Sequence, residues 1–217
     1  MRTFGFPEFL FILEAARWTL ELSAIAFVGG AILGLAIALA RVSDMPLLRR
    51  AAGVFIQVFQ GTPLLLQLFL IFFGAPVVGL DINPWIAAGA ALILNSAAFL
   101  GEIWRGCIES IPRGQWEAAE ALSLRYSARM RDVVLPQAFR IALAPTVGYL
   151  VQIIKGTSLA AIIGFTEITR AGQIINNATF QPLIVFSVVA VLYFFICWPL
   201  SLLAARMERH RARALVR

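Results

Sequence analysis

The chain has 217 residues, of which 60% are hydrophobic and only 14% are charged, and its formal net charge is +6. A soluble domain has about 45–50% apolar and about 25% charged residues, so this chain carries more apolar surface than one aqueous core can bury. The composition excludes an ordinary soluble domain and predicts an integral membrane protein, whose surplus apolar surface faces lipid.

The positive charge does not indicate nucleic-acid binding. The basic residues stand in short blocks between apolar runs, as they do in loops that orient a membrane protein. Two isolated cysteines, Cys107 and Cys197, form neither a disulfide framework nor a metal-ligand spacing. The first residues include Glu8 and Glu14 and lack a cleavage-site pattern, so we expect an amphipathic lead-in to the first span.

Five stretches are long and apolar enough to cross a bilayer, which takes about 20 mainly apolar residues in a helix. They cover approximately residues 18–40, 52–78, 85–104, 141–165 and 183–205. The second and fourth stretches also contain proline and polar side chains. We therefore predict an all-α membrane protein with about five transmembrane helices, organised as a single domain over residues 1–217.

Positive charge predicts the orientation of these spans. Cytoplasmic loops carry the excess of Lys and Arg, so we expect the N-terminus outside and the C-terminus inside, in agreement with an odd number of spans. The opposite side has only Arg2, Arg17 and Arg170. The predicted cytoplasmic side has fourteen of the 18 basic residues, namely Arg41, Arg49, Arg50, Arg105, Arg113, Arg125, Arg129, Arg131, Arg140, Arg206, Arg209, Arg211, Arg213 and Arg217.

Small residues mark a close helix contact on the first span. Gly30 and Gly34 lie four residues apart, a spacing that lets two membrane helices approach closely. Ordinary packing within the chain is the favoured interpretation, and a contact between two subunits is the alternative.

The longest predicted cytoplasmic segment runs from about residue 106 to 140. Residues 115–124 are mostly good helix formers, and residues 126–134 are basic and amphipathic up to Pro136. We expect two short helices on the cytoplasmic surface, the first with exposed Ala side chains and the second closed by Pro136. The residues alone leave two roles open, namely insertion into a groove of a partner protein and adsorption to lipid headgroups.

This segment contains a spaced series of residues, namely Glu117-Ala118-Ala119, Ser123, Val133, Leu135 and Pro136. Their spacing resembles the cytoplasmic EAA loop of ABC importer permeases. That loop has Glu-Ala-Ala, three residues, Gly, nine residues, Ile, one residue and Leu-Pro. Here Val133 stands at the Ile position and Ser123 at the Gly position. If the backbone at Ser123 needs a positive φ, serine costs free energy there that glycine would not. The matching residues in which the resemblance places ATPase coupling are Glu117, Ala118, Ala119, Ala121, Ser123, Leu135 and Pro136.

Three further segments are similar to the polar amino-acid subfamily of these permeases, which handles histidine, glutamate, arginine or opines. They are residues 60–69 (QGTPLLLQLF), 102–106 (EIWRG) and 155–159 (KGTSL). The resemblance implies a bacterial inner-membrane protein paired with a second permease subunit, either a second copy or a different chain. It also implies two ATPase subunits docked on the loop, a periplasmic solute-binding protein and a polar amino acid as cargo.

The residues also argue against catalysis by this chain. A Walker-type phosphate loop needs Gly-Lys-Ser/Thr, and the single lysine, Lys155, follows Ile154 in an apolar stretch. We therefore expect a non-enzymatic subunit with no cofactor and no metal site, whose ATP is hydrolysed by a partner.

Charged side chains within spans are costly and indicate function. Glu102 and Lys155 have two open interpretations. In the first, they neutralise each other or hydrogen-bond between helices, for structure alone. In the second, they form two walls of a polar cavity in which Lys155 meets the carboxylate and Glu102 the amine of a zwitterion. The candidate substrate-pathway residues are Thr62, Gln67, Glu102, Lys155, Thr157 and Ser158.

An ion-gradient-driven secondary transporter of amino acids is the alternative function. It accounts for the spans and for the intramembrane charges. It gives no reason for the EAA-type loop, and the chain has no internal inverted repeat of the kind that such transporters use. A membrane scaffold without transport activity would not require polar residues at mid-membrane.

Overall fold

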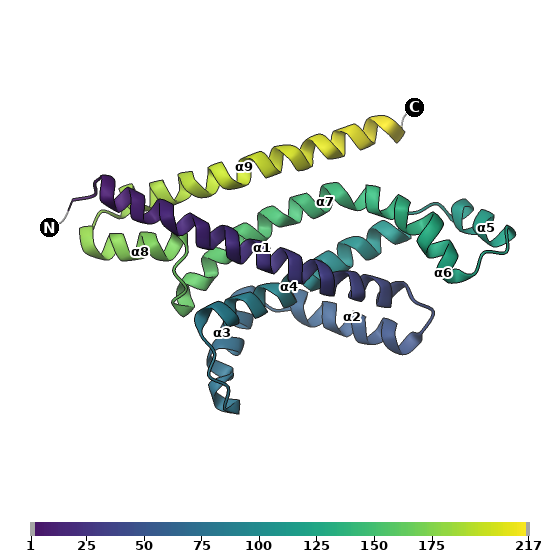
Figure 1. The fold of residues 1–217 in the computed structure, drawn as a ribbon, viewed down its shortest axis with the longest axis horizontal. Coiled ribbons are helices and arrows are strands. Elements are labelled where there is room, and N and C mark those ends of the chain that lie inside the picture. The colour runs from purple at the N-terminus through teal and green to yellow at the C-terminus, as the bar shows by residue number, and fades with distance from the viewer. Residues whose placement is uncertain (1–2, 216–217) are drawn as a thin grey trace.

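The computed structural model describes the backbone of residues 3–215 and the side chains of residues 3–210. Within this range every regular element is helical, which confirms the predicted all-α class (Figure 1). In chain order the elements are α1 (Phe6–Val42), α2 (Pro46–Gly61), α3 (Leu64–Gly74), the 3-10 helix η1 (Pro76–Val78), α4 (Pro84–Glu109), α5 (Arg113–Ala121), α6 (Tyr126–Ala128), the π-helical turn η2 (Arg129–Val134), α7 (Leu135–Gly156), the 3-10 helix η3 (Thr157–Ile163), α8 (Ile168–Thr179) and α9 (Pro182–Leu215).

Four helical segments are long and apolar enough to cross a membrane, and a bent pair makes a fifth candidate. The four are Phe6–Val42, Pro84–Glu109, Tyr126–Ile163 and Pro182–His210. The first begins well before the predicted residue 18, because Glu8 Oε2 accepts the Gly5 N–H at 3.0 Å and Pro7 occupies the first turn. Its 37 residues exceed the thickness of the hydrocarbon core, so part of α1 extends beyond it.

The predicted second span, residues 52–78, is bent. α2 and the α3–η1 segment meet at 100°. Pro63 has no N–H to donate and disfavours the helical conformation at Thr62, whose φ of −113° and ψ of 139° are extended. Gln67 Nε2 donates to the Phe59 carbonyl at 2.8 Å and to the Thr62 carbonyl at 3.0 Å, so its amide satisfies backbone groups that the break leaves open.

α1 and α4 pack against each other through small residues. A Cβ on Gly30 would lie 2.5 Å from Ser96 Cβ, and one on Gly34 would lie 3.1 Å from the Ala97 carbonyl oxygen. No larger side chain fits without separating the helices. The two glycines therefore serve packing within the chain, as the favoured interpretation of their spacing predicted.

The predicted second surface helix is not separate from the candidate span that follows it. Residues 126–163 form one continuous helical segment, so Pro136 does not close a short helix. Pro136 lies in the first turn of α7, directly after the π-helical turn. The missing N–H of proline is tolerated at that position, and π turns accommodate irregular hydrogen bonding inside helices.

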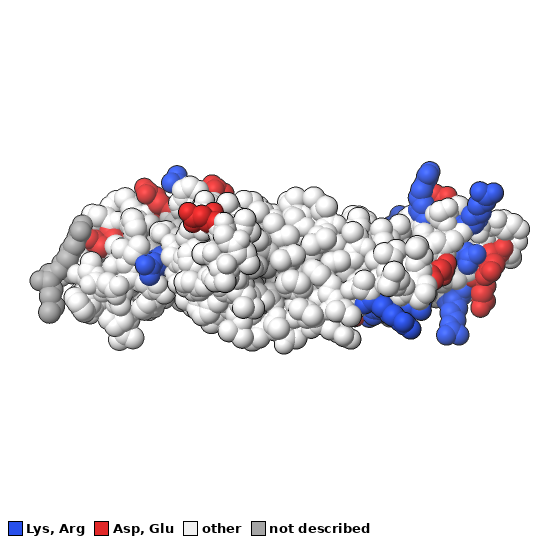
Figure 2. Space-filling view, turned by 90° about the horizontal axis from the view of Figure 1, so that it is seen from below, with Lys and Arg blue, Asp and Glu red and all other residues white. Residues whose placement is uncertain are grey.

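The two ends of the molecule differ in charge. α5 and α6 lie at one end, and the N-terminus and α8 lie at the other (Figure 1). Basic side chains gather at the α5–α6 end, and the surface between the ends carries no charge on the face seen in Figure 2. The excess of Lys and Arg assigns the α5–α6 end to the cytoplasm. The side chains of Arg2, Arg211, Arg213 and Arg217, which entered the prediction, lie outside the described residues.

Candidate functional site

The cytoplasmic helix α5 rests on a small apolar cluster of its own. Trp116 of α5 packs against buried residues of α4, η2 and α7 together with the link that follows α4, namely Ile108, Ile111, Met130, Val134 and Ala138. Leu135, at the start of α7, packs against the same cluster. Burial of these side chains ties α5 to the cytoplasmic ends of two candidate spans, so a force applied to α5 reaches the spans.

Main-chain hydrogen bonds close the C-terminus of α5. The Leu124 N–H donates to the Ala119 carbonyl at 3.2 Å, and the Ser123 N–H donates to the Glu120 carbonyl at 2.8 Å. This pair of bonds is the Schellman motif, which requires a left-handed residue directly after the cap. Ser123 has φ 55° and occupies that position. The suspected positive φ is confirmed, and it explains why glycine is usual there in the EAA pattern.

The predicted coupling residues divide between an exposed face and the interior. Glu117, Ala118 and Ala121 are exposed, and Leu122 is 75% exposed at the end of α5. Ala119 is only 3% exposed. The expectation that the Ala side chains of α5 face outward is therefore wrong for Ala119. Trp116 and Ala119 share the face that packs inward because they lie three residues apart on the helix.

A second polar group lies beside the bend between α2 and α3. Asn95 Nδ2 donates to Gln67 Oε1 at 3.2 Å, and Tyr149 Oη lies 3.4 Å from Asn95 Oδ1. Gln67 Nε2 also donates to Thr62 Oγ1 at 2.9 Å. The structure thus brings Thr62 and Gln67 together, and Asn95 joins them from α4. Gln67 and Asn95 are buried, so their amides are held in a fixed orientation.

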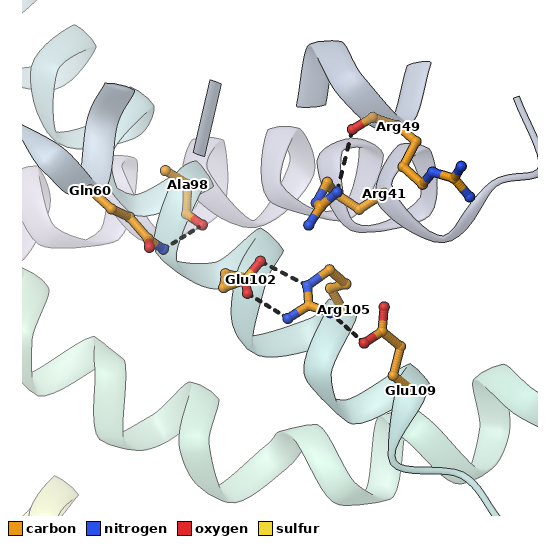
Figure 3. A network of polar contacts seen from close by, with 7 residues as sticks. All are labelled: Arg41, Arg49, Gln60, Ala98, Glu102, Arg105 and Glu109. Carbon is orange, nitrogen blue, oxygen red and sulfur yellow. Dashed lines mark hydrogen bonds and ion pairs between the residues drawn. The ribbon is translucent and has the colours of Figure 1, made fainter. Parts of the chain in front are cut away.

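Glu102 does not meet Lys155. Its oxygens accept from Arg105 Nε at 2.8 Å and from Arg105 Nη2 at 2.5 Å, and Arg105 also pairs with Glu109 (Figure 3). The interpretation that Glu102 and Lys155 neutralise each other is wrong for this chain. The spacing of three and four residues along one helix face could have revealed the observed partners.

Lys155 lies apart from the other candidates. It is exposed and lines a cavity of about 410 Å³ between α7 and α9, whereas Glu102 lines a different cavity beside α2. The predicted cavity with Glu102 and Lys155 as its two walls is therefore not formed within the described residues. The hydroxyl of Thr157 donates to the Ile154 carbonyl, and the hydroxyl of Ser158 donates to the Lys155 carbonyl, each at 2.7 Å.

Glu167, which the sequence analysis did not select, is a fully buried carboxyl group at the start of α8. It accepts the N–H groups of Thr169 and Arg170, each at 2.8 Å, and the hydroxyl of Tyr193 at 2.6 Å. Burial raises the pKa of Glu167, and these donors oppose the rise. A carboxyl residue directly before an apolar helical pattern was the available signal.

Comparison with known proteins shows that this chain is similar to membrane components of transport systems. The family model described as "Binding-protein-dependent transport system inner membrane component" matches residues 30–213. The chain is 39% identical to the probable amino-acid ABC transporter permease protein YckA of Bacillus subtilis, over 88% of this chain and 84% of that relative. It is 38% identical to the L-cystine transport system permease protein TcyB of Bacillus subtilis, over 90% of this chain and 84% of that relative.

A third relative and two solved structures agree. The chain is 38% identical to the glutamine transport system permease protein GlnP of Escherichia coli K12, over 94% of both chains. A crystal structure of an amino acid ABC transporter with histidines aligns with a TM-score of 0.88 and 31% identity, over 96% of this chain and 100% of that one. An inward-facing MetNI methionine ABC transporter shares the fold, with a TM-score of 0.79 and 19% identity over 95% and 99% of the chains.

Proposed function

This chain belongs to the family of binding-protein-dependent transport system inner membrane components, and we propose that it imports amino acids as one permease subunit of an ABC transporter. Three relatives are named as amino-acid, L-cystine or glutamine permeases, which supports a polar amino acid or a close relative as cargo. The remaining parts of the proposed machine are a second permease subunit, two ATPase subunits and a periplasmic solute-binding protein.

One observation carries the proposal, namely the exposed face of α5 on a helix that the apolar cluster holds in place. Glu117, Ala118 and Ala121 offer a small-residue surface with one carboxylate, and Leu122 adds an exposed apolar side chain beside it. An ATPase groove that takes up this face would bury Leu122 and could push on α4 and α7 through α5. Ala119 supports the helix from inside, and Ser123 closes its end.

The docking role is tested by Glu117→Lys. Glu117 is exposed, so the change leaves the fold intact but reverses the charge on the proposed contact surface. We expect uptake driven by ATP to be abolished and the ATPase subunits to be lost on co-purification, with normal membrane insertion. Glu14→Lys, an equally exposed carboxylate on α1, is the matched control and should leave ATPase capture unchanged. Normal capture and normal uptake in the Glu117 variant would rule out docking through α5.

The proposed substrate pathway no longer includes a cavity shared by Glu102 and Lys155. Lys155 offers an exposed ammonium group in the last turn of α7, towards the C-terminal end of the candidate span Tyr126–Ile163. Thr62, Gln67, Thr157 and Ser158 offer polar atoms at the helix breaks. We propose that Lys155 contacts the carboxylate of the substrate. The second permease subunit would supply the other side of this binding site. Glu102, which is held by Arg105 and lines a separate cavity, is left out of this proposed pathway.

Lys155→Met tests this pathway. Loss of a charged partner of a bound carboxylate should lower amino-acid uptake by about 30-fold or more. Since Lys155 is exposed, thermal unfolding and ATPase co-purification should stay unchanged. Lys155→Arg is the conservative control and should recover part of the uptake. Uptake near wild type in the Met variant would remove Lys155 from the pathway while leaving the docking proposal intact.

A further inference from the structure

The strongest unassigned feature is a basic cavity between the cytoplasmic ends of α1, α2 and α4. Its volume is about 590 Å³. Arg41 enters it from the last turn of α1, and Arg49 and Arg50 enter from the first two turns of α2. The remaining lining residues are Gly53, Val54, Ile56, Gln57, Gln60 and Glu102. Figure 3 shows Arg41 and Arg49 beside the α4 residues of this region.

Among the described residues that line this cavity, Glu102 is the single carboxylate facing three arginines, and it attracts Arg41. Both oxygens of Glu102 accept hydrogen bonds from Arg105. Among the described residues, no ion pair includes Arg41, Arg49 or Arg50. Three guanidinium groups around one cavity repel one another unless an anion lies between them.

The guanidinium of Arg41 has one nitrogen without an acceptor and another with a long hydrogen bond. Its Nε is buried and has no partner within the described chain, and its Nη1 reaches the Arg49 carbonyl at 3.5 Å, the outer limit of a hydrogen bond. A buried donor without an acceptor is unfavourable. The guanidinium is therefore oriented and available for an acceptor that enters the cavity.

The level of the cavity along the molecule and its apolar side favour a phospholipid headgroup over free phosphate as the anion. Arg41 lies in the last turn of α1, and Arg49 and Arg50 lie near the start of α2, where the apolar α1 ends on the basic cytoplasmic side. This is the level of the lipid headgroups. Val54 lines the cavity and is 59% exposed, and Val58, one turn further along α2, is 51% exposed. A phosphate group beside the arginines could thus continue into acyl chains along the apolar side of α2. Inorganic phosphate has no apolar part that could contact this side of α2.

We propose that this cavity binds the phosphate headgroup of an anionic phospholipid of the cytoplasmic leaflet. The three arginines supply the positive charge, Gln57 and Gln60 supply hydrogen-bonding groups, and α2 supplies the surface for the lipid tails. Basic pockets between helices on the cytoplasmic side have the chemistry to recognise such headgroups.

Native mass spectrometry of the full chain in detergent tests the site, with dioleoylphosphatidylglycerol, dioleoylphosphatidylcholine and inorganic phosphate as separate probes. Removing all three arginines, as Arg41→Gln, Arg49→Gln and Arg50→Gln together, should weaken phosphatidylglycerol binding by about a hundredfold. The matched control removes three exposed cytoplasmic arginines outside the cavity, as Arg140→Gln, Arg206→Gln and Arg209→Gln together. It should weaken binding far less.

A steric variant keeps every charge. A Cβ on Gly53 would lie 3.4 Å from Arg41 Nη1, so Gly53→Leu should fill the cavity and displace phosphatidylglycerol without changing the unfolding temperature. Wild-type binding in Gly53→Leu would overturn the proposal, as would equal losses in the triple variant and its control. Inorganic phosphate that binds as tightly as phosphatidylglycerol would make this a soluble-phosphate site instead. Equal binding of phosphatidylcholine would exclude recognition of anionic lipid.

Discussion

Two helix ends in this molecule are closed by opposite means. At the start of α8, the side chain of Glu167 accepts two N–H groups, Thr19 Oγ1 accepts the Ile168 N–H at 3.3 Å, and the Glu167 carbonyl accepts the Ala171 N–H. At the end of α5, main-chain groups close the helix through the left-handed conformation of Ser123. The start of α8 depends on the carboxylate of Glu167 as a hydrogen-bond acceptor. The end of α5 depends on a backbone conformation with positive φ at Ser123.

The difference indicates that the start of α8 serves the structure of the protein and that the end of α5 serves contact with a partner. Glu167 is fully buried, and its carboxyl joins α8 to α9 through Tyr193, so the α8 end has its polar groups paired inside the protein. The α5 end leaves Leu122 and Ser123 exposed to the cytoplasm. A helix that is closed by its own backbone can keep its outward side chains available for a partner, which is what the proposed docking role requires.

The largest effect is expected from Glu167→Leu. The change removes the acceptor of two helix N–H groups and of the Tyr193 hydroxyl, in a site without access to water. Loss of an N-cap together with a buried unsatisfied donor should lower the free energy of unfolding by about 3 kcal/mol. Denaturant unfolding of the detergent-solubilised chain measures this. Glu14→Leu, at an exposed position, should change stability little, and an equally small change at Glu167 would refute the structural role of the α8 end.

A matched pair on α5 distinguishes its two faces. Ala119→Trp forces a large side chain into the buried face and should cost about 1–3 kcal/mol through overpacking. Ala118→Trp adds the same side chain to the exposed face and should leave unfolding unchanged while reducing ATPase co-purification. Thermal unfolding and co-purification of the two variants give the comparison. Similar unfolding temperatures would contradict the assignment of Ala119 to the interior.

The smallest expected effect is a gain at Ser123. Glycine adopts positive φ without the steric cost of a Cβ but loses more conformational entropy on folding, so Ser123→Gly should stabilise the loop by about 0.5–1 kcal/mol. Slower hydrogen exchange of the amides around residues 119–124 would report it. Ser127→Gly, within a helical segment, should instead destabilise the loop by about 0.5 kcal/mol. A loss of protection in Ser123→Gly would mean that the serine side chain stabilises the turn.

Much of the fold was predictable because it depends on patterns along the chain. Apolar runs predicted five spans, and the blocks of arginine predicted which end is cytoplasmic. The spacing between Glu117 and Pro136 identified the loop by its resemblance to the EAA pattern, and the glycine usual at position 123 of that pattern raised the question of a positive φ. Each of these inferences uses neighbouring residues or the energy of transfer into lipid, so no knowledge of the tertiary contacts was needed.

Tertiary structure decided the rest. Pro63 breaks the helix locally, but the 100° angle between α2 and the α3–η1 segment depends on what packs beside them. The burial of Ala119 and the continuity of the helix through Pro136 depend on packing in the same way. The pairing of Glu167 with Tyr193 joins residues 26 apart on different helices, and no local pattern encodes which helix faces that carboxyl group. Hydropathy and charge determined a membrane protein and its cytoplasmic end, because both act locally, and the resemblance of residues 117–136 to the EAA loop indicated a permease. Which polar groups meet inside it was settled only when the helices packed, because those distances are set by long-range contacts.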